Sequence, residues 1–308
     1  MRKILNLFWK IITAPFRFVA WIVRSIAATL TKGAQGISSY FKEEDLEDAP
    51  IGDTLASTIE NPRALLPHIN ALRKHLLRAV LAIVVTTAVS FLFVHDILAY
   101  LAAPMSGGIQ ELVAIDVTEN VGTVMRVTLL SGFTLALPYV IFEIWLFVAP
   151  ALKVSSRIKG LFAIPAAIVL FVGGMAFAFF IMLPAALPFL FNFMGLTTQP
   201  RPSSYYNFVT LIMFWIGVTF EFPLVIYLLA SLGWIKAKTL ASQWRIAIVV
   251  IAILAAVITP TVDPVNMSLV MAPMIVLYFI SIGLAYFAQR NRSAKQKEAL
   301  EQANQSPT

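Results

Sequence analysis

The sequence predicts an all-α integral membrane protein with six transmembrane helices and both termini in the cytoplasm. Three observations support this. Of the 308 residues, 59% are hydrophobic and only 13% are charged, about half the charged share of a soluble domain. Long apolar segments recur along the chain, and lysine and arginine gather in alternate loops between them. So few charges cannot cover a water-exposed surface, and lipid must therefore be part of the solvent.

Six segments meet or approach the roughly 20 apolar residues that a spanning helix needs. The fifth is short for a full span, and the sixth is predicted to be interrupted near Pro273. We expect both to tilt or to lie where the bilayer is thinned. The segments are too long for barrel strands and do not alternate in polarity. They cover residues 77–95, 122–149, 160–190, 206–232, 244–260 and 266–288.

The orientation follows from the basic residues. Of the 23 lysines and arginines, 21 precede the first span, follow spans two and four, or follow the last span; only Arg126 and Arg201 fall on the other side. Because basic loops stay in the cytoplasm, we expect a multi-pass protein of the plasma (cytoplasmic) membrane with both termini inside. The net charge of +7 then reflects membrane orientation rather than binding to nucleic acid.

The membrane domain is predicted to cover residues 62–288, with other segments on both sides. Residues 1–40 carry a basic residue every seven positions among apolar ones, which predicts a basic amphipathic helix in the membrane interface or a helix docked on the protein itself. Residues 41–61 contain the run Glu43, Glu44, Asp45, Glu47 and Asp48 and read as an acidic linker. Residues 289–308 are polar and predicted to be a disordered cytoplasmic tail.

Nothing in the sequence predicts an enzyme. There is no cysteine, so thiolate metal sites and cysteine nucleophiles are excluded. Neither a Ser–His–Asp grouping nor a nucleotide-binding or zinc-protease motif is found. The dipeptide His95-Asp96 fits a structural helix end. We therefore expect no cofactor and no metal.

Two glutamates within the spans are candidates for function. Glu221 lies in the middle of the fourth span, two residues before Pro223, which predicts a bend and a wet concave surface. The alternative is a protonated glutamate that bonds a neighbouring helix. Glu143, near the cytoplasmic end of the second span, either faces the same cavity or is an ordinary interfacial residue beside Trp145.

Six motifs, in order over about residues 62–288, resemble the TatC family. Residues 67–76 (PHINALRKHL) resemble its HLxELRxRL signature, and residues 145–152 (WLFVAPAL) resemble its W-x-F-x-x-P-A-L segment. Pro104 resembles the family's proline at the start of the first outer loop, residues 174–184 resemble the third span, and residues 220–223 (FEFP) match its F-E-x-P motif. Residues 258–263 and 271–273 resemble the turn after the fifth span and the last span. The family positions identified as structural are Pro104, Pro138, Pro150, Pro223, Pro260 and Asp263. For Asp263, a plain turn-forming role remains the alternative.

The resemblance implies a glove-shaped six-helix receptor without catalytic activity. It implies recognition of twin-arginine signal peptides on folded cargo, driven by the proton-motive force. It also implies TatA/TatB-type single-span partners and assembly into homo- or hetero-oligomers. Arg73 aligns with the family arginine of the signal-recognition region, and Glu221 aligns with the polar residue of the concave face.

Two departures affect signal binding. Where the family has glutamates thought to pair with the signal's arginines, this chain has Ala71 and Ser156. The signal-binding candidates are therefore Arg73, Ala71, Ser156 and Glu143. Either Glu143 or the acidic run at residues 43–48 could supply the negative charge that the two missing glutamates would have provided. The alternative for the acidic run is a plain solvated linker. A divergent or accessory member of the family is expected.

Two other classes remain open. A small-solute or ion transporter would use Glu221 as a proton or cation site, although no internal repeat is evident. A membrane scaffold would associate with TatA/TatB-type partners without binding signals.

Overall fold

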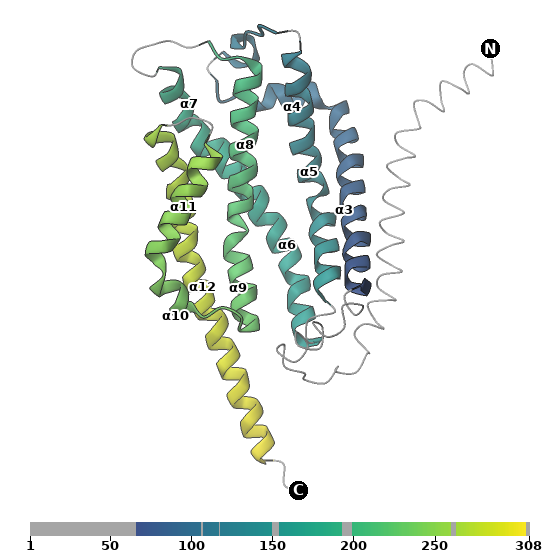
Figure 1. The fold of residues 1–308 in the computed structure, drawn as a ribbon, viewed down its shortest axis with the longest axis vertical. Helices are drawn as coiled ribbons and strands as arrows, with labels where there is room; N and C mark the ends of the chain where they lie inside the picture. Colours follow the sequence, from purple (N-terminus) through teal and green to yellow (C-terminus); the bar gives the residue numbers. More distant parts are fainter. Residues whose placement is uncertain are drawn as a thin grey trace, which may run out of the picture. The chain divides into compact units, whose positions relative to one another are not determined.

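The computed structural model describes residues 66–105, 107–116, 118–149, 154–192, 199–259 and 263–305. The predicted interfacial helix (1–40) and acidic linker (41–61) lie outside these residues, as do Pro150 and Pro260. Residues 66–149 and 155–308 form one compact unit. Within the described ranges the chain is helical and contains no strand (Figure 1). The helices are α3 (Leu66–Leu92), α4 (Val94–Leu101), α5 (Glu119–Val148), α6 (Val154–Phe177), α7 (Leu183–Phe191), α8 (Pro202–Phe220), α9 (Phe222–Leu232), α10 (Ala237–Ser242), α11 (Trp244–Ile258) and α12 (Pro264–Gln305).

The predicted six spans are confirmed. Five stretches of the described chain are long and apolar enough to cross a membrane: Ile69–Leu92, Glu119–Val148, Ala163–Phe191, Pro202–Leu232 and Pro264–Asn291. The remaining one, Trp244–Ile258, is shorter, as the sequence indicated for the fifth span. At 1.5 Å per residue, its 15 residues extend about 22 Å, which is less than the roughly 30 Å hydrocarbon core.

The first helix begins earlier than predicted. α3 starts at Leu66 rather than near residue 77, so the segment resembling the family signature forms its first turns. Arg73 and Lys74 lie before the predicted span, since charge normally marks the edge of a span. Lysine and arginine favour helix, and their long side chains can carry the charge toward the interface.

Two spans contain local breaks beside proline. The helical pattern stops at Phe220, Glu221 forms a turn, and α9 resumes at Phe222. Pro223 has no N–H to offer the carbonyl one turn earlier, which accounts for this break. In the third span, a π-helical turn (Ala178–Met182) separates α6 from α7 just before Pro184. Such turns absorb a missing hydrogen bond within a continuous span.

Two predictions about the last span were wrong. Pro273 lies inside α12 without interrupting it, because a proline inside a membrane helix is tolerated when its surroundings satisfy the freed carbonyl. The tail predicted to be disordered is instead helical as far as Gln305. Its sequence after residue 293 consists largely of Ala, Lys, Gln, Glu and Leu, which are strong helix formers even where polarity is high.

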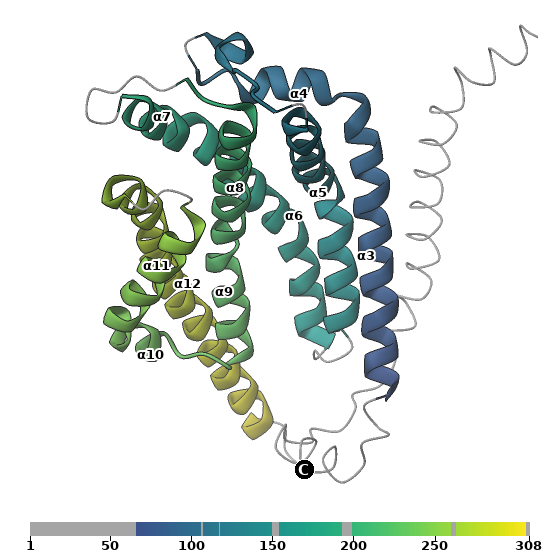
Figure 2. The same cartoon turned by 45° about the horizontal axis from the view of Figure 1, so that its top comes forward.

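The helices pack in sequence-distant pairs. α3 packs along α5, α9 packs along α12, and α5 also packs against α8; Figure 2 shows α8 between α5 and α12. The main hydrophobic core joins α5, α7, α8 and α12, and its fully buried side chains include Val127, Leu183, Ile212, Ile216 and Val270.

Hydrogen bonds connect the helices at the end of the unit where α4 lies (Figure 1). The Tyr205 and Tyr206 hydroxyls donate to the carbonyls of Leu101 and Leu98, each at 2.8 Å. Glu119, the first residue of α5, accepts the Ser203 hydroxyl at 2.5 Å and its backbone N–H at 3.1 Å. These bonds tie α4 and α5 to the start of α8, so the helix ends are fixed together there.

Candidate functional site

The opposite end of the unit, where α3 begins and α5 ends, holds the predicted signal-binding residues. Arg73 lies on α3 with an exposed side chain, and Ala71 is half-buried on the same helix. Ser156 belongs to the first turn of α6, and its side chain lies outside the described atoms. Arg73 is therefore available to a ligand, whereas the two positions that lack the family's glutamates offer no charge.

Glu143 is buried in the interface between α5 and α3. Only 1% of its surface is exposed. Its Oε2 lies 2.5 Å from the Nδ1 of His75 on α3 and 4.0 Å from the Nη1 of Arg78. The Tyr139 hydroxyl, one turn earlier on α5, lies near the same carboxylate. A carboxylate sealed in this way needs such partners, since an unpaired buried charge is costly.

The sequence did not predict the pairing of Glu143 with His75. The two residues are 68 positions apart, and nothing local relates them. One signal was available: residues 67–76 resemble the family signature, and His75 stands where that signature has its second arginine. An altered basic residue of a motif is a reason to look for an altered acidic partner.

Glu221 lies in a different interface. It occupies the turn between α8 and α9, and its carboxylate approaches the backbone of Phe171 on α6. Its Oε1 is buried and has no hydrogen-bond partner among the described atoms. Glu143 faces α3 instead, so the structure does not bring the two glutamates together in one cavity.

Close packing of glycines places α6 beside Glu221. A Cβ on Gly174 would stand 2.9 Å from the Cα of Gly217 and 2.9 Å from the carbonyl oxygen of Ile216. A Cβ on Gly217 would meet the ring of Phe171 at 3.0 Å. Small residues at such a crossing let two membrane helices approach backbone to backbone. The position of Glu221, one turn after Gly217, is therefore fixed by this crossing.

The motif residues that the structure describes lie within helices or at helix ends. Pro223 is buried in the first turn of α9, whereas Pro138 lies inside α5 with an exposed ring. Pro104 is half-buried in the turn after α4. Asp263 precedes α12 and accepts the backbone N–H of Asn266 at 2.7 Å and its side-chain amide at 2.9 Å. This is the geometry of a helix N-cap and fits the turn-forming role.

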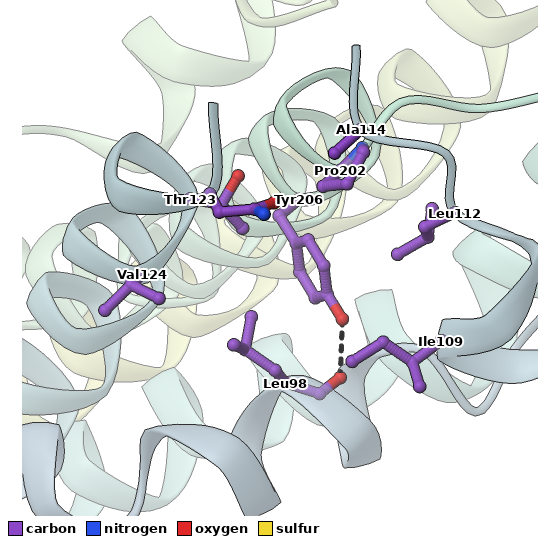
Figure 3. A pocket seen from close by; sticks show the side chains of 9 residues that line it. Leu98, Ile109, Leu112, Ala114, Thr123, Val124, Pro202 and Tyr206 are labelled. Atoms are coloured by element: carbon purple, nitrogen blue, oxygen red, sulfur yellow. Dashed lines mark hydrogen bonds between the residues drawn. The ribbon is translucent and has the colours of Figure 1, made fainter. Parts of the chain in front are cut away.

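A small cavity lies at the α4 end of the unit (Figure 3). Its volume is about 300 Å³, and its lining has no charged side chain. The Tyr206 hydroxyl donates to the Leu98 carbonyl, and the Thr123 hydroxyl donates to the Glu119 carbonyl. Leu98, Ile109, Leu112 and Val124 contribute apolar surface. Asn120 is the other polar residue of the lining, so most of the cavity wall is apolar.

Comparisons with known proteins point to one family. The sequence model described as Sec-independent protein translocase protein (TatC) matches residues 67–273. The Sec-independent protein translocase protein TatC of Carboxydothermus hydrogenoformans is 36% identical over 230 residues, covering 74% of this chain and 95% of that protein. The TatC of Koribacter versatilis is 31% identical, covering 77% of this chain and 90% of that protein.

A solved structure is also similar. The crystal structure of a twin-arginine translocase receptor, TatC, superposes with a TM-score of 0.65 at 31% sequence identity. The superposition covers 72% of this chain and 99% of that chain. The similarity in sequence and in structure therefore extends over nearly the whole length of these known proteins.

Proposed function

Because this chain belongs to the TatC family of Sec-independent protein translocase subunits, we propose that it is the multi-pass membrane receptor subunit of a twin-arginine translocase. The observation that carries the proposal is the match over residues 67–273, which runs from the start of α3 into α12 and includes the α8–α9 break. Its role is to bind and place cargo in the membrane rather than to catalyse a reaction.

The proposed location is the plasma membrane, with both termini in the cytoplasm. α3 begins, and α5 and α9 end, at one end of the compact unit (Figure 1). The basic residues Arg73, Lys74, Lys236 and Lys238 lie near these helix ends. Basic residues flanking spans favour the cytoplasmic side, which supports placing this end in the cytoplasm and the Glu119–Ser203 end outside.

The proposed partners are TatA/TatB-type single-span proteins and twin-arginine signal peptides on folded cargo, with the proton-motive force as the energy source. Signal binding would use the exposed cytoplasmic end of α3, around Arg73, and the start of α6. The described carboxylate nearest this surface, Glu143, is buried and paired with His75. We propose that the acidic run at residues 43–48 supplies the carboxylates that the signal's arginines require.

Signal recognition is tested by photo-crosslinking. A photoreactive residue at position 156 would be exposed to a precursor with a twin-arginine signal and to its twin-lysine version. The expected result is a crosslink that falls about tenfold with twin lysine, since the loss of one charge-assisted hydrogen bond costs ~1.5–3 kcal/mol. Neutralising the acids at 43–48 should reduce the crosslink to the same level. Equal crosslinks with both signals would contradict the receptor role. If the protein forms stable complexes with single-span partners but crosslinks to neither signal, it acts as a scaffold.

The transporter alternative makes a separate prediction at Glu221. In proteoliposomes that contain this protein alone, we expect the same proton and cation flux for the natural chain and for Glu221→Gln, because a receptor has no conducting path of its own. The flux would be followed with an internal pH dye under an imposed potential, with protein-free vesicles as the control. A leak that disappears in Glu221→Gln would favour the transporter.

A further inference from the structure

The first half of α3 has little apolar packing among its described side chains, residues 69–80. Ala71, His75 and Ala79 follow at intervals of four residues and are the half-buried or buried positions between residues 69 and 80, which places them on the stripe facing α5. The neighbouring Leu72 and Leu76 are 47% and 59% exposed. Alanine side chains bury little area. His75 is therefore the largest side chain that the described residues 69–80 of α3 turn toward α5.

His75 makes that contact with Glu143. The Nδ1–Oε2 distance is 2.5 Å, the carboxylate is 1% exposed, and the imidazole ring lies edge-on to Phe147 with centroids 6.2 Å apart. A buried hydrogen bond between two side chains has a narrow geometry, so it defines an orientation in a way that apolar contacts do not. It fixes both the rotation of α3 about its axis and its distance from α5.

We propose that the His75–Glu143 pair is a positioning element of the signal-binding surface, holding the cytoplasmic end of α3 so that Arg73 keeps a fixed place relative to the end of α5. The inference rests on the proposed receptor function. Glu143 is not itself the ligand of a signal arginine, because the carboxylate is sealed and already engaged. Arg73, two residues before His75, moves whenever that turn of α3 moves.

The position of α3 can be measured without any signal peptide. The chain has no cysteine, so spin labels would attach only at introduced sites, and Leu72→Cys with Ile144→Cys places one label on an exposed position of each helix. We expect a narrow distance distribution in the natural background and a broad one in His75→Leu and in Glu143→Leu. Asp96→Asn, which changes an exposed carboxylate on α4, is the control and should leave the distribution narrow.

Signal binding by the same variants then tests the consequence. His75→Leu should weaken twin-arginine binding about tenfold per folded molecule, and His75→Arg, which also offers Glu143 an N–H donor, should bind like the natural chain. Unchanged distributions in both leucine variants would overturn the positioning role, as would a His75→Arg variant as weak as His75→Leu. If the natural chain binds no signal, the receptor function fails while the distance measurement still decides whether the pair positions α3.

Discussion

Replacing Gly174 by leucine is expected to remove most of the folded protein, whereas the same change at the adjacent Gly173 is expected to be tolerated. A Cβ at Gly174 would meet Gly217 Cα and the Ile216 carbonyl oxygen at 2.9 Å, and both are backbone atoms that no rotamer change can move. A Cβ at Gly173 has no atom within 4 Å. Overpacking against a neighbouring element costs about 1–3 kcal/mol or more.

The two variants form a matched pair on one helix. Their composition, hydrophobicity and distance from the helix ends are the same, so insertion into the membrane should not distinguish them. Size-exclusion chromatography of detergent-extracted protein and thermal denaturation would report the folded fraction and its midpoint. A Gly174→Leu variant as abundant and as stable as Gly173→Leu would show that α6 and α8 do not cross at these glycines.

Restoring the two missing glutamates is expected to strengthen arginine-dependent signal binding at least about tenfold, because each charge-assisted hydrogen bond contributes ~1.5–3 kcal/mol. The variant is Ala71→Glu with Ser156→Glu. Ala71 is half-buried on α3, two residues from the exposed Arg73, so a longer side chain there can reach the surface. The affinity would be measured by titrating a twin-arginine signal peptide against the purified protein.

The control for this gain is Ala71→Gln with Ser156→Gln, which has the same shape without charge. Ala71 is one turn from His75 on the same stripe, so a glutamate at position 71 could compete with Glu143 for the His75 imidazole. The single variant Ser156→Glu is therefore also needed, because it adds an acid without that competition. A gain of the same size for a twin-lysine peptide would indicate general electrostatic attraction. No gain in any acidic variant would mean that carboxylates at these positions do not govern recognition.

The class of fold, the number of spans and the short fifth helix could all be predicted from the sequence. These depend on the local content of apolar residues and on where charge interrupts it, so each can be read within a window of about 20 residues. The break at Glu221 was equally local, because a proline two residues later removes a hydrogen bond whatever the surroundings. The family resemblance also came from linear motifs and agrees with the comparisons.

Which faces of the helices meet could not be predicted from the sequence and is known only from the packed structure. It placed Glu143 against His75 rather than in a cavity with Glu221, and it brought Gly174 against Gly217. In the structure, α12 also continues past Pro273 and extends to Gln305. Apolar content places a helix in the membrane but does not choose its partner, since lipid and protein are similarly apolar. Partners are chosen by close packing and by the need to pair buried polar groups, and both depend on residues far apart in the sequence.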